Sequence, residues 1–255
     1  MAFFRCEFYS KAINISTGMN VILPEDVSDG DYPTLYLLHG YTDNYDAWMR
    51  WTSIERYVRD YKLAVVMPDV HKSFYNDFPG INGGYKYWTF VSEELIEISR
   101  RFFRLSHKRE DTFVAGLSMG GFGAFKCALN RPDIYSAAAS LSGALHITQG
   151  LENRMENNEV RMFLGDLDKV KGSINDLFSA AEKTSKLSEK EKPRLYQYCG
   201  TEDFLYDGNI EFRDFIQDLG FDYTYEESPG DHQWKYWDKY IKKFIGMLDL
   251  ELIQV

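Results

Sequence analysis

Apolar and polar residues alternate near the start of the chain and then give way to longer apolar runs. Residues 3–10 and 13–23 alternate around a short turn, which predicts an antiparallel strand pair at one edge of a sheet. The continuous apolar runs 34–38 and 63–67 are typical of parallel strands that are buried on both faces. The remaining predicted strands cover residues 113–116, 137–141, 193–199 and 221–226.

Segments with helical spacing separate these strands. The predicted helices cover residues 53–60, 90–104, 121–129, 210–219 and 234–250. This alternation predicts one α/β domain over residues 1–255, with a doubly wound, mostly parallel sheet and antiparallel N-terminal edge strands. The polar segment 145–192 departs from the pattern and predicts either a small helical cap or a solvated excursion. Its apolar candidates for lining a pocket are Met155, Met162, Phe163 and Leu164.

The most informative motif lies where the predicted strand 113–116 meets the helix 121–129. It has the sequence Gly116-Leu117-Ser118-Met119-Gly120, with a serine at the apex of a sharp turn. Small glycines on both sides of the serine let the strand and the helix nearly touch, as at the nucleophile of a hydrolase. The alternative is a glycine-rich turn whose serine only caps the helix.

A serine nucleophile needs a histidine base, and that histidine needs a carboxylate. In this fold the acid and then the histidine follow the serine, each on a loop after a late strand. His232 follows the last predicted strand, whereas His146 precedes every suitable acid, so His232 is the predicted base. Asp203, directly after the strand 193–199, is the predicted acid. Two further acids stay open as alternatives: Glu202, and Asp207, which resembles the N-cap of the next helix.

The negative charge that develops on a substrate carbonyl oxygen requires backbone N–H donors placed in advance. Met119, directly after the serine, supplies one predicted donor. The second is expected from the loop after the strand 34–38, where Gly40 permits a sharp turn and Tyr41 offers its N–H. His39 is expected either to orient this loop by hydrogen bonds or to be a buried histidine without a part in the chemistry.

Net charge and cysteine content limit which partners and which cellular compartment are expected. The net charge of −10 and the pI near 5.1 argue against nucleic acid or an anionic membrane surface as a partner. Cys6, Cys127 and Cys199 form an odd set without a C-x-x-C pair, as expected for reduced thiols in a cytoplasmic protein. No signal peptide, membrane-spanning run or zinc-binding spacing is evident in the sequence.

Aromatic residues make up 16 % of the chain and gather near the predicted site. They are suited to stacking on a phenolic acyl group or on a sugar. The predicted substrate-binding residues are Trp48, Trp88, Phe204 and Trp234. The alternative is that most of these rings belong to the core or to an interface.

Four segments carry a resemblance that extends over nearly the whole chain: 36–44, 116–124, 199–206 and 229–232, the last with Trp234 and Trp237. They resemble the esterase D-like "putative esterase" group of α/β-hydrolases, and within it bacterial tributyrin, acetyl and feruloyl esterases. The resemblance implies an α/β-hydrolase fold and hydrolysis of short-chain esters by Ser118, His232 and Asp203, with no metal or organic cofactor. One relative, S-formylglutathione hydrolase, usually has a Thr–Cys pair where this chain has Thr42 and Asp43.

The resulting hypothesis is a serine carboxylesterase that acts through an acyl-enzyme on acetyl, butyryl, feruloyl or acetylated-sugar esters. Hydrolysis of a thioester such as S-formylglutathione, or acyl transfer to an alcohol, would use the same residues. A non-catalytic binding protein is the alternative from another class. Self-association into a homo-oligomer is the default expectation.

Overall fold

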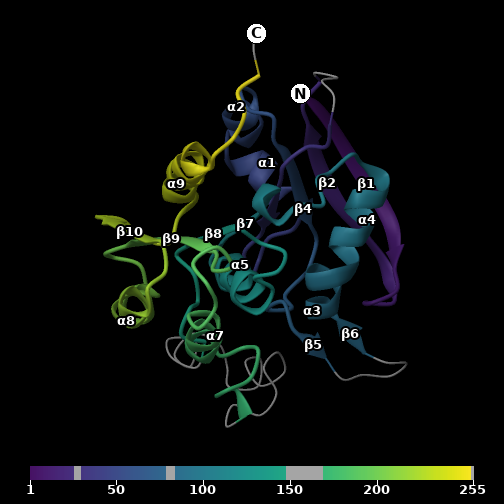
Figure 1. Ribbon diagram of the computed structural model, residues 1–255. Helices are drawn as coiled ribbons and strands as arrows, with labels where there is room; N and C mark the ends of the chain where they lie inside the picture. Colours follow the sequence, from purple (N-terminus) through teal and green to yellow (C-terminus); the bar gives the residue numbers. More distant parts are fainter. Residues whose placement is uncertain (26–29, 79–83, 148–168, 254–255) are drawn as a thin grey trace.

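The computed structural model describes residues 1–25, 30–78, 84–147 and 169–253, and a sheet of eight strands runs through them (Figure 1). The order of strands in the sheet is β1-β2-β4-β3-β7-β8-β9-β10. From β4 to β10 every neighbouring pair is parallel, while β1 and β2 are antiparallel at one edge. The strands are β1 (Ala2–Ser10), β2 (Ile15–Leu23), β3 (Thr34–Leu38), β4 (Ala64–Pro68), β7 (Thr112–Leu117), β8 (Ala137–Leu141), β9 (Arg194–Gly200) and β10 (Tyr223–Ser228).

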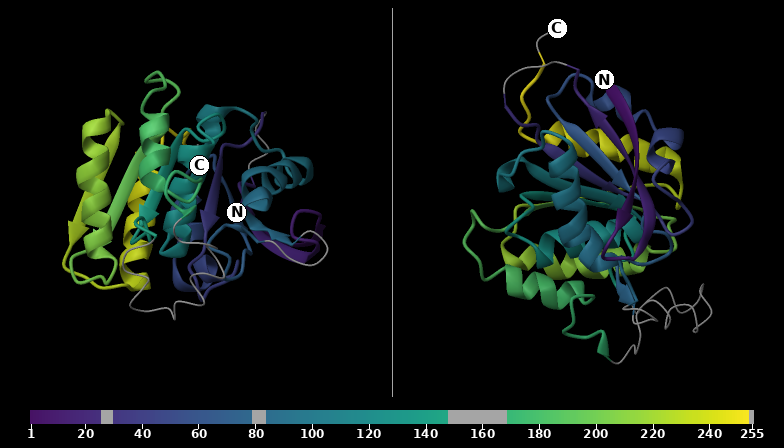
Figure 2. Two further views of the ribbon diagram at one scale, coloured as in Figure 1. Left: turned by 90° about the horizontal axis from the view of Figure 1, so that it is seen from below. Right: turned by 90° about the vertical axis from the view of Figure 1, so that its right-hand side faces the viewer.

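Helices cover both faces of this sheet (Figures 1 and 2). One face carries α1 (Ala47–Trp51), α2 (Ile54–Val58) and α9 (Trp234–Met247). The other carries α3 (Tyr87–Thr89), α4 (Leu95–Phe102), α5 (Met119–Asn130), α7 (Leu177–Thr184) and α8 (Tyr206–Ile216). A π-helical turn, Phe90–Glu94, joins α3 to α4, and the short hairpin β5 (Asp77–Phe78) and β6 (Tyr85–Lys86) precedes them.

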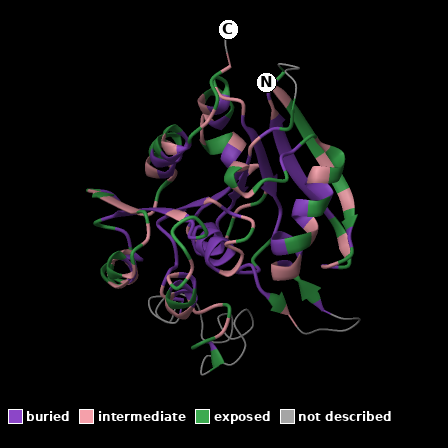
Figure 3. Ribbon diagram, viewed as in Figure 1, coloured by how far each residue is buried: buried purple, intermediate pink, exposed green. Residues whose placement is uncertain are grey.

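The two cores follow from the side-chain alternation of the strands. In β3, Leu35 and Leu37 face the core under α2 and α9, while Tyr36 and Leu38 face the core under α4 and α5. Helix α5 is buried along nearly its whole length, as the purple ribbon at the centre of Figure 3 shows. Truncating a large buried side chain such as Leu35 or Leu37 to alanine would cost about 2–5 kcal/mol of unfolding free energy.

The fold class predicted from the sequence is confirmed, including the antiparallel edge and the mostly parallel sheet. Strands β3 and β8 have the predicted bounds, and the other predicted strands are displaced by one or two residues at their ends. Where the sequence predicts one helix over 90–104, the structure has a helical segment that starts at Tyr87 and passes through the π turn.

The polar segment 145–192 is described only in part, because residues 148–168, with Met155, Met162, Phe163 and Leu164, lie outside the described residues. Its described helix, α7, connects β8 to β9 on the same face as α5 and α8. Phe178 of α7 packs against Phe212 and Phe215 of α8, with ring centroids 5.3 and 4.9 Å apart. This part of the segment is a crossover helix of the sheet.

Candidate active site

Ser118 occupies the tight turn between β7 and α5. Its backbone has φ 53° and ψ −118°, a left-handed conformation that a non-glycine residue adopts only under strain. A Cβ atom at Gly116 would lie 2.3 Å from the Gly120 carbonyl oxygen, and one at Gly120 would lie 2.4 Å from that of Leu38. Only glycine therefore fits on either side of Ser118, as the sequence motif predicts.

His232 and Asp203 reach Ser118 from the carboxyl ends of two other strands. The Nε2 atom of His232 lies 2.9 Å from Ser118 Oγ, and its Nδ1 atom lies 2.8 Å from Asp203 Oδ2 and 3.0 Å from Oδ1. The Asp203 side chain is completely buried, while the His232 side chain keeps 19 % of its surface exposed. The three predicted side chains thus form one continuous chain of hydrogen-bonding contacts.

The loops that carry His232 and Asp203 are packed directly on each other. A Cβ atom at Gly200 would lie 2.2 Å from the carbonyl oxygen of Gly230, which also accepts the N–H of Glu202 at 2.9 Å. The Leu205 N–H donates to Asp203 Oδ1 at 2.9 Å and fixes the carboxylate further. Because the two loops are in backbone contact, the backbone fixes the distance between the acid and the base.

The two alternative acids lie elsewhere. Glu202 and Asp207 are both exposed, whereas Asp203 points inward to His232. The prediction that Asp207 caps the helix is wrong, because α8 already begins at Tyr206 and Asp207 lies in its first turn.

Aromatic rings enclose His232. Phe204 lies 4.6 Å from the imidazole, centroid to centroid, and Trp237 of α9 meets it edge-on at 4.8 Å. The Trp237 indole N–H donates to Ser142 Oγ at 3.1 Å, which holds the ring in place. Phe204 keeps 37 % of its surface exposed, while Trp237 is buried. Phe204 is thus available to a ligand, and Trp237 supports the imidazole from behind.

The loop after β3 approaches Ser118 through Gly40. A Cβ atom at Gly40 would lie 3.7 Å from Ser118 Cβ, so the loop runs directly beside the serine. Tyr41 follows Gly40 in this loop. Met119 is the first residue of α5, where backbone N–H groups have no acceptor within the helix. The two predicted oxyanion donors, the Tyr41 and Met119 amides, therefore belong to segments that flank Ser118.

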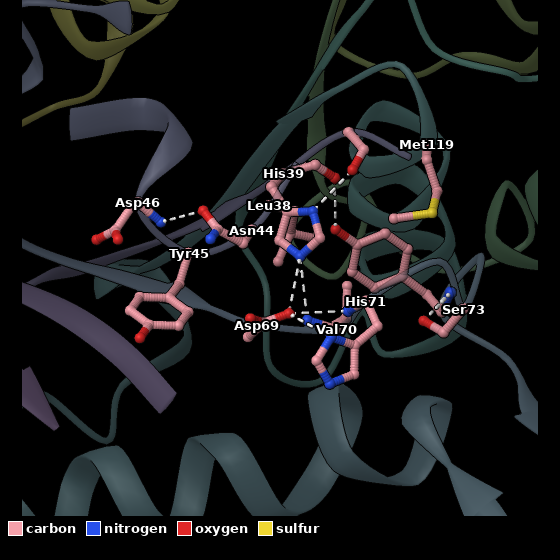
Figure 4. Close-up of polar contacts among 12 residues, drawn as sticks. Leu38, His39, Asn44, Tyr45, Asp46, Asp69, Val70, His71, Ser73 and Met119 are labelled. Atoms are coloured by element: carbon pink, nitrogen blue, oxygen red, sulfur yellow. Dashed lines mark hydrogen bonds and ion pairs between the residues drawn. The ribbon is translucent and has the colours of Figure 1, made fainter. Parts of the chain in front are cut away.

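Side chains from several elements hold this loop in place (Figure 4). The Val70 N–H donates to His39 Nε2 at 3.0 Å, so His39 Nδ1 carries the proton and donates to Gly40 O at 2.7 Å. The Tyr75 hydroxyl donates to His39 O at 2.9 Å. Both ring nitrogens of the buried His39 are bonded to backbone, so this histidine orients the loop, one of the two roles expected for it.

Asp69 and His71 continue this network towards solvent. Asp69 Oδ1 accepts the His71 N–H at 2.9 Å, lies 3.2 Å from His71 Nδ1 and lies 3.6 Å from His39 Nε2. Burial would raise the pKa of Asp69, but the neighbouring His39 and His71 groups outweigh it and lower that pKa well below its usual range. The contact with Asp69 raises the pKa of His71, although burial opposes this.

The prediction that Trp48 binds substrate is wrong. Trp48 has no exposed surface, and its indole N–H donates to Leu38 O at 3.0 Å. Trp234 packs edge-on against it, with ring centroids 5.2 Å apart, and remains partly exposed. Trp48 is therefore part of the support beneath the loop, while contact of Trp234 with substrate stays a prediction.

Trp88 lies beside an unusual buried cation, Lys126 of α5. The Nζ atom lies 4.7 Å from the centre of a Trp88 ring and donates to Tyr75 O at 2.7 Å. It also donates to the side-chain oxygens of Asn76 and Asn175, at 2.5 and 2.6 Å. Burial lowers the pKa of Lys126 to about 7. One face of Trp88 is thus taken by Lys126, and its contact with substrate stays a prediction.

Sequence reasoning missed the supporting residues Asp69 and Tyr75, and it named Trp237 only as part of the family resemblance, without a role. Asp69 had a detectable signal, since it is a polar residue directly after a buried strand. Among the described side chains, no three His, Cys, Asp or Glu residues gather as they would around a metal ion. No described helix combines the length and apolar character needed to cross a membrane.

Comparison with known proteins shows the family of the chain. A family model described as "Putative esterase" matches residues 10–248. The chain is 35 % identical over 257 residues to the acetyl esterase of Caldicellulosiruptor saccharolyticus, covering 94 % of this chain and 96 % of that relative.

Two solved structures from Staphylococcus aureus are also similar. One is the fluorophosphonate-binding serine hydrolase F with substrate bound, with a TM-score of 0.87 and 34 % identity. The other is S-formylglutathione hydrolase (FrmB), with a TM-score of 0.85 and 33 % identity. Each comparison covers 97 % of this chain and 98 % of the other.

Proposed function

The chain belongs to the "Putative esterase" family and is a carboxylic ester hydrolase, and from this premise we propose that Ser118, His232 and Asp203 are its catalytic triad. The observation that carries the proposal is the unbroken series of contacts from Ser118 Oγ through His232 to Asp203. In this arrangement Asp203 keeps His232 protonated at Nδ1, so that the Nε2 lone pair faces the serine hydroxyl.

The reaction begins when Ser118 Oγ attacks the carbonyl carbon of the ester and His232 Nε2 takes the hydroxyl proton. The tetrahedral intermediate collapses as His232 returns that proton to the leaving alcohol. An acyl group is then joined to Ser118. Water, deprotonated by His232, releases the acid and restores the serine.

The Met119 and Tyr41 amides are the proposed oxyanion donors. Removing one such donor typically costs about 3 kcal/mol of transition-state stabilisation. The support for Tyr41 is the fixed path of the chain just before it, where His39, Tyr75 and Trp48 each donate to a backbone carbonyl of residues 38–40. A fixed donor needs no reorganisation when the charge develops, so these contacts favour catalysis.

The proposed substrates are short-chain acyl esters, with acetyl first because of the acetyl esterase relative. Phe204 and Trp234 are proposed to contact the substrate, since Phe204 packs against His232, Trp234 packs against Trp237, and both keep exposed surface. Butyryl, feruloyl and acetylated-sugar esters belong to the same proposal, and the protein is proposed to act in the cytoplasm.

The direct test combines activity with chemical labelling. Wild-type protein should hydrolyse p-nitrophenyl acetate and butyrate and should take up one fluorophosphonate group on Ser118, located by peptide mass spectrometry. Ser118→Ala should lose both properties, while Ser142→Ala, a serine in the neighbouring turn, should keep the label on Ser118. Ester hydrolysis that persists in Ser118→Ala would overturn the nucleophile assignment.

A second candidate function is hydrolysis of the thioester S-formylglutathione. The similarity to the S. aureus structure with that title favours it. The same triad would act, with a thiol as the leaving group. Turnover of S-formylglutathione well above that of p-nitrophenyl acetate would make the thioester the preferred class.

A further inference from the structure

Asp43 is an acidic residue close to Ser118 that the proposed mechanism does not use. It lies in the loop after β3 and is partly buried. The Asp43 N–H donates to Gly40 O at 3.2 Å. This turn hydrogen bond and the close approach of the carboxylate to Gly40 hold Asp43 against the loop.

The carboxylate lies against Gly40, the glycine that also lies beside the nucleophile. A Cβ atom at Gly40 would lie 2.9 Å from Asp43 Oδ2 and 3.7 Å from Ser118 Cβ. Burial raises the pKa of Asp43, against the opposing influence of His39, the Gly40 amide and His232. Asp43 is thus partly shielded from bulk water and packed against the glycine that lies beside Ser118.

Neither established part of a triad site accounts for a carboxylate here. The acid beside the base is already Asp203, which is in direct contact with His232. A negative charge beside the oxyanion would repel it and slow the reaction. An ionised carboxylate is, however, a strong hydrogen-bond acceptor with up to four lone-pair positions.

We infer that Asp43 is a specificity-determining residue that accepts a hydrogen bond from a hydroxyl group on the alcohol part of the substrate. The inference rests on the proposed function, hydrolysis of short-chain acyl esters. Such an acyl group has no hydroxyl to donate, so the donor must belong to the alcohol part. Asp43 then favours esters of neutral polyhydroxy compounds over esters of simple alcohols. It also disfavours alcohol or thiol parts that carry carboxylates, through repulsion of like charges.

The test compares two acetyl esters that differ only in the alcohol part, acetylated xylo-oligosaccharide and p-nitrophenyl acetate. The measured quantity is the ratio of their kcat/KM values. Asp43→Ala should lower this ratio about 10- to 100-fold, the value of a hydrogen bond to a charged group. Asp43→Asn, which keeps the shape and one acceptor oxygen but has no charge, should lower it less and should raise the relative turnover of S-formylglutathione.

The matched control is Asp46→Asn, in the same loop, because the Asp46 carboxylate is hydrogen-bonded to Arg5 and Asn20. It should leave the ratio as in the wild type. An equal ratio in Asp43→Ala and wild type, or no turnover of the acetylated oligosaccharide by the wild type, would overturn the role of Asp43. Hydrolysis of p-nitrophenyl acetate that survives Ser118→Ala would instead overturn the proposed function itself.

Discussion

Two histidine–aspartate pairs lie at carboxyl ends of strands on opposite sides of β7, which carries Ser118. His232 contacts Asp203 through Nδ1 and Ser118 through Nε2. His39 bonds to backbone through both nitrogens, at Gly40 O and at the Val70 N–H, and Asp69 lies 3.6 Å from its ring. The side chain of His232 is 19 % exposed and that of His39 only 1 %.

The different partners of the two imidazoles show that residue type and position at a strand end do not decide the role of a histidine. A base needs one nitrogen free to exchange a proton with the reacting group, and only His232 presents one to Ser118. His39 instead uses its two nitrogens as a rigid bracket between β3 and the segment after β4. We therefore expect substitutions in the first pair to affect chemistry, and those in the second to affect loop geometry and stability.

The largest contrast is expected between His232→Ala and His39→Ala. The first removes the base and should lower kcat by about 10⁴-fold or more, with little effect on urea unfolding. The second leaves the buried Val70 N–H without its acceptor, which should cost about 2–3 kcal/mol of unfolding free energy. Its kcat, measured below the unfolding transition, should fall about 10- to 100-fold. A stable His39→Ala protein as inactive as His232→Ala would break the distinction.

Matched acid substitutions are expected to give the next largest effect. Asp203→Asn keeps the shape but favours the wrong imidazole tautomer, and should lower kcat about 10³- to 10⁴-fold. Asp69→Asn should lower it less than about tenfold, because His39 already holds its proton through Gly40. Asp207→Asn, an exposed acid on α8, is the control and should resemble the wild type. A comparable loss in Asp69→Asn would show that both pairs act in proton transfer.

The first pair could be predicted from the sequence, whereas in the second only a loop-orienting role for His39 was among the expectations. Ser118, Asp203 and His232 follow in the order that an α/β sheet with late loops requires, and each comes directly after an apolar run or shortly beyond one. The topology then brings their strand ends to one edge of the sheet. Local patterns and chain order were sufficient for this part of the site.

The supporting contacts depend on how distant elements pack, and no local pattern records that packing. Trp48 illustrates the problem, since an aromatic residue shortly after the loop has the same sequence appearance whether it lines a site or fills a core. Its burial results from the docking of α1 against Trp234 of α9, far away in the sequence. The hydroxyl of Tyr75 likewise reaches His39 only because α5 and the segment after β4 are packed beside β3.

Tyr75→Phe tests the catalytic effect of the contacts that hold the loop after β3, because it removes one hydrogen bond to that loop. The ring is retained, and only the donor to His39 O is lost. We expect kcat to fall about three- to tenfold with KM nearly unchanged, because a displaced oxyanion donor weakens transition-state binding. Tyr135→Phe, another fully buried tyrosine, should alter stability by a similar amount without altering kcat. Equal kcat values for the two variants would show that the bracket has no catalytic effect.

The smallest expected effect is a pH dependence of stability from His71, the outer member of the second pair. Its pKa in the folded protein is raised by Asp69 above the ordinary value of 6.5, so folding favours its protonated form. The contribution is complete below pH 6.5 and disappears as the pH rises through the raised value. Because the side chain is 56 % exposed, solvent screening limits the contribution to about 0.5 kcal/mol.

The matched variant for this test is His71→Asn, since asparagine tolerates the left-handed backbone at this position, with φ 47°. Urea unfolding of both proteins at pH 5.5 and pH 8.5 should show a stability difference that is larger at the acid value. Asp69 would still accept the backbone N–H of residue 71 in the variant, so its carboxylate should stay in place. A stability difference between the two proteins that grows with pH would have the wrong sign for a histidine whose protonated form is stabilised by a carboxylate. It would show that the contact of His71 with Asp69 does not cause the pH dependence.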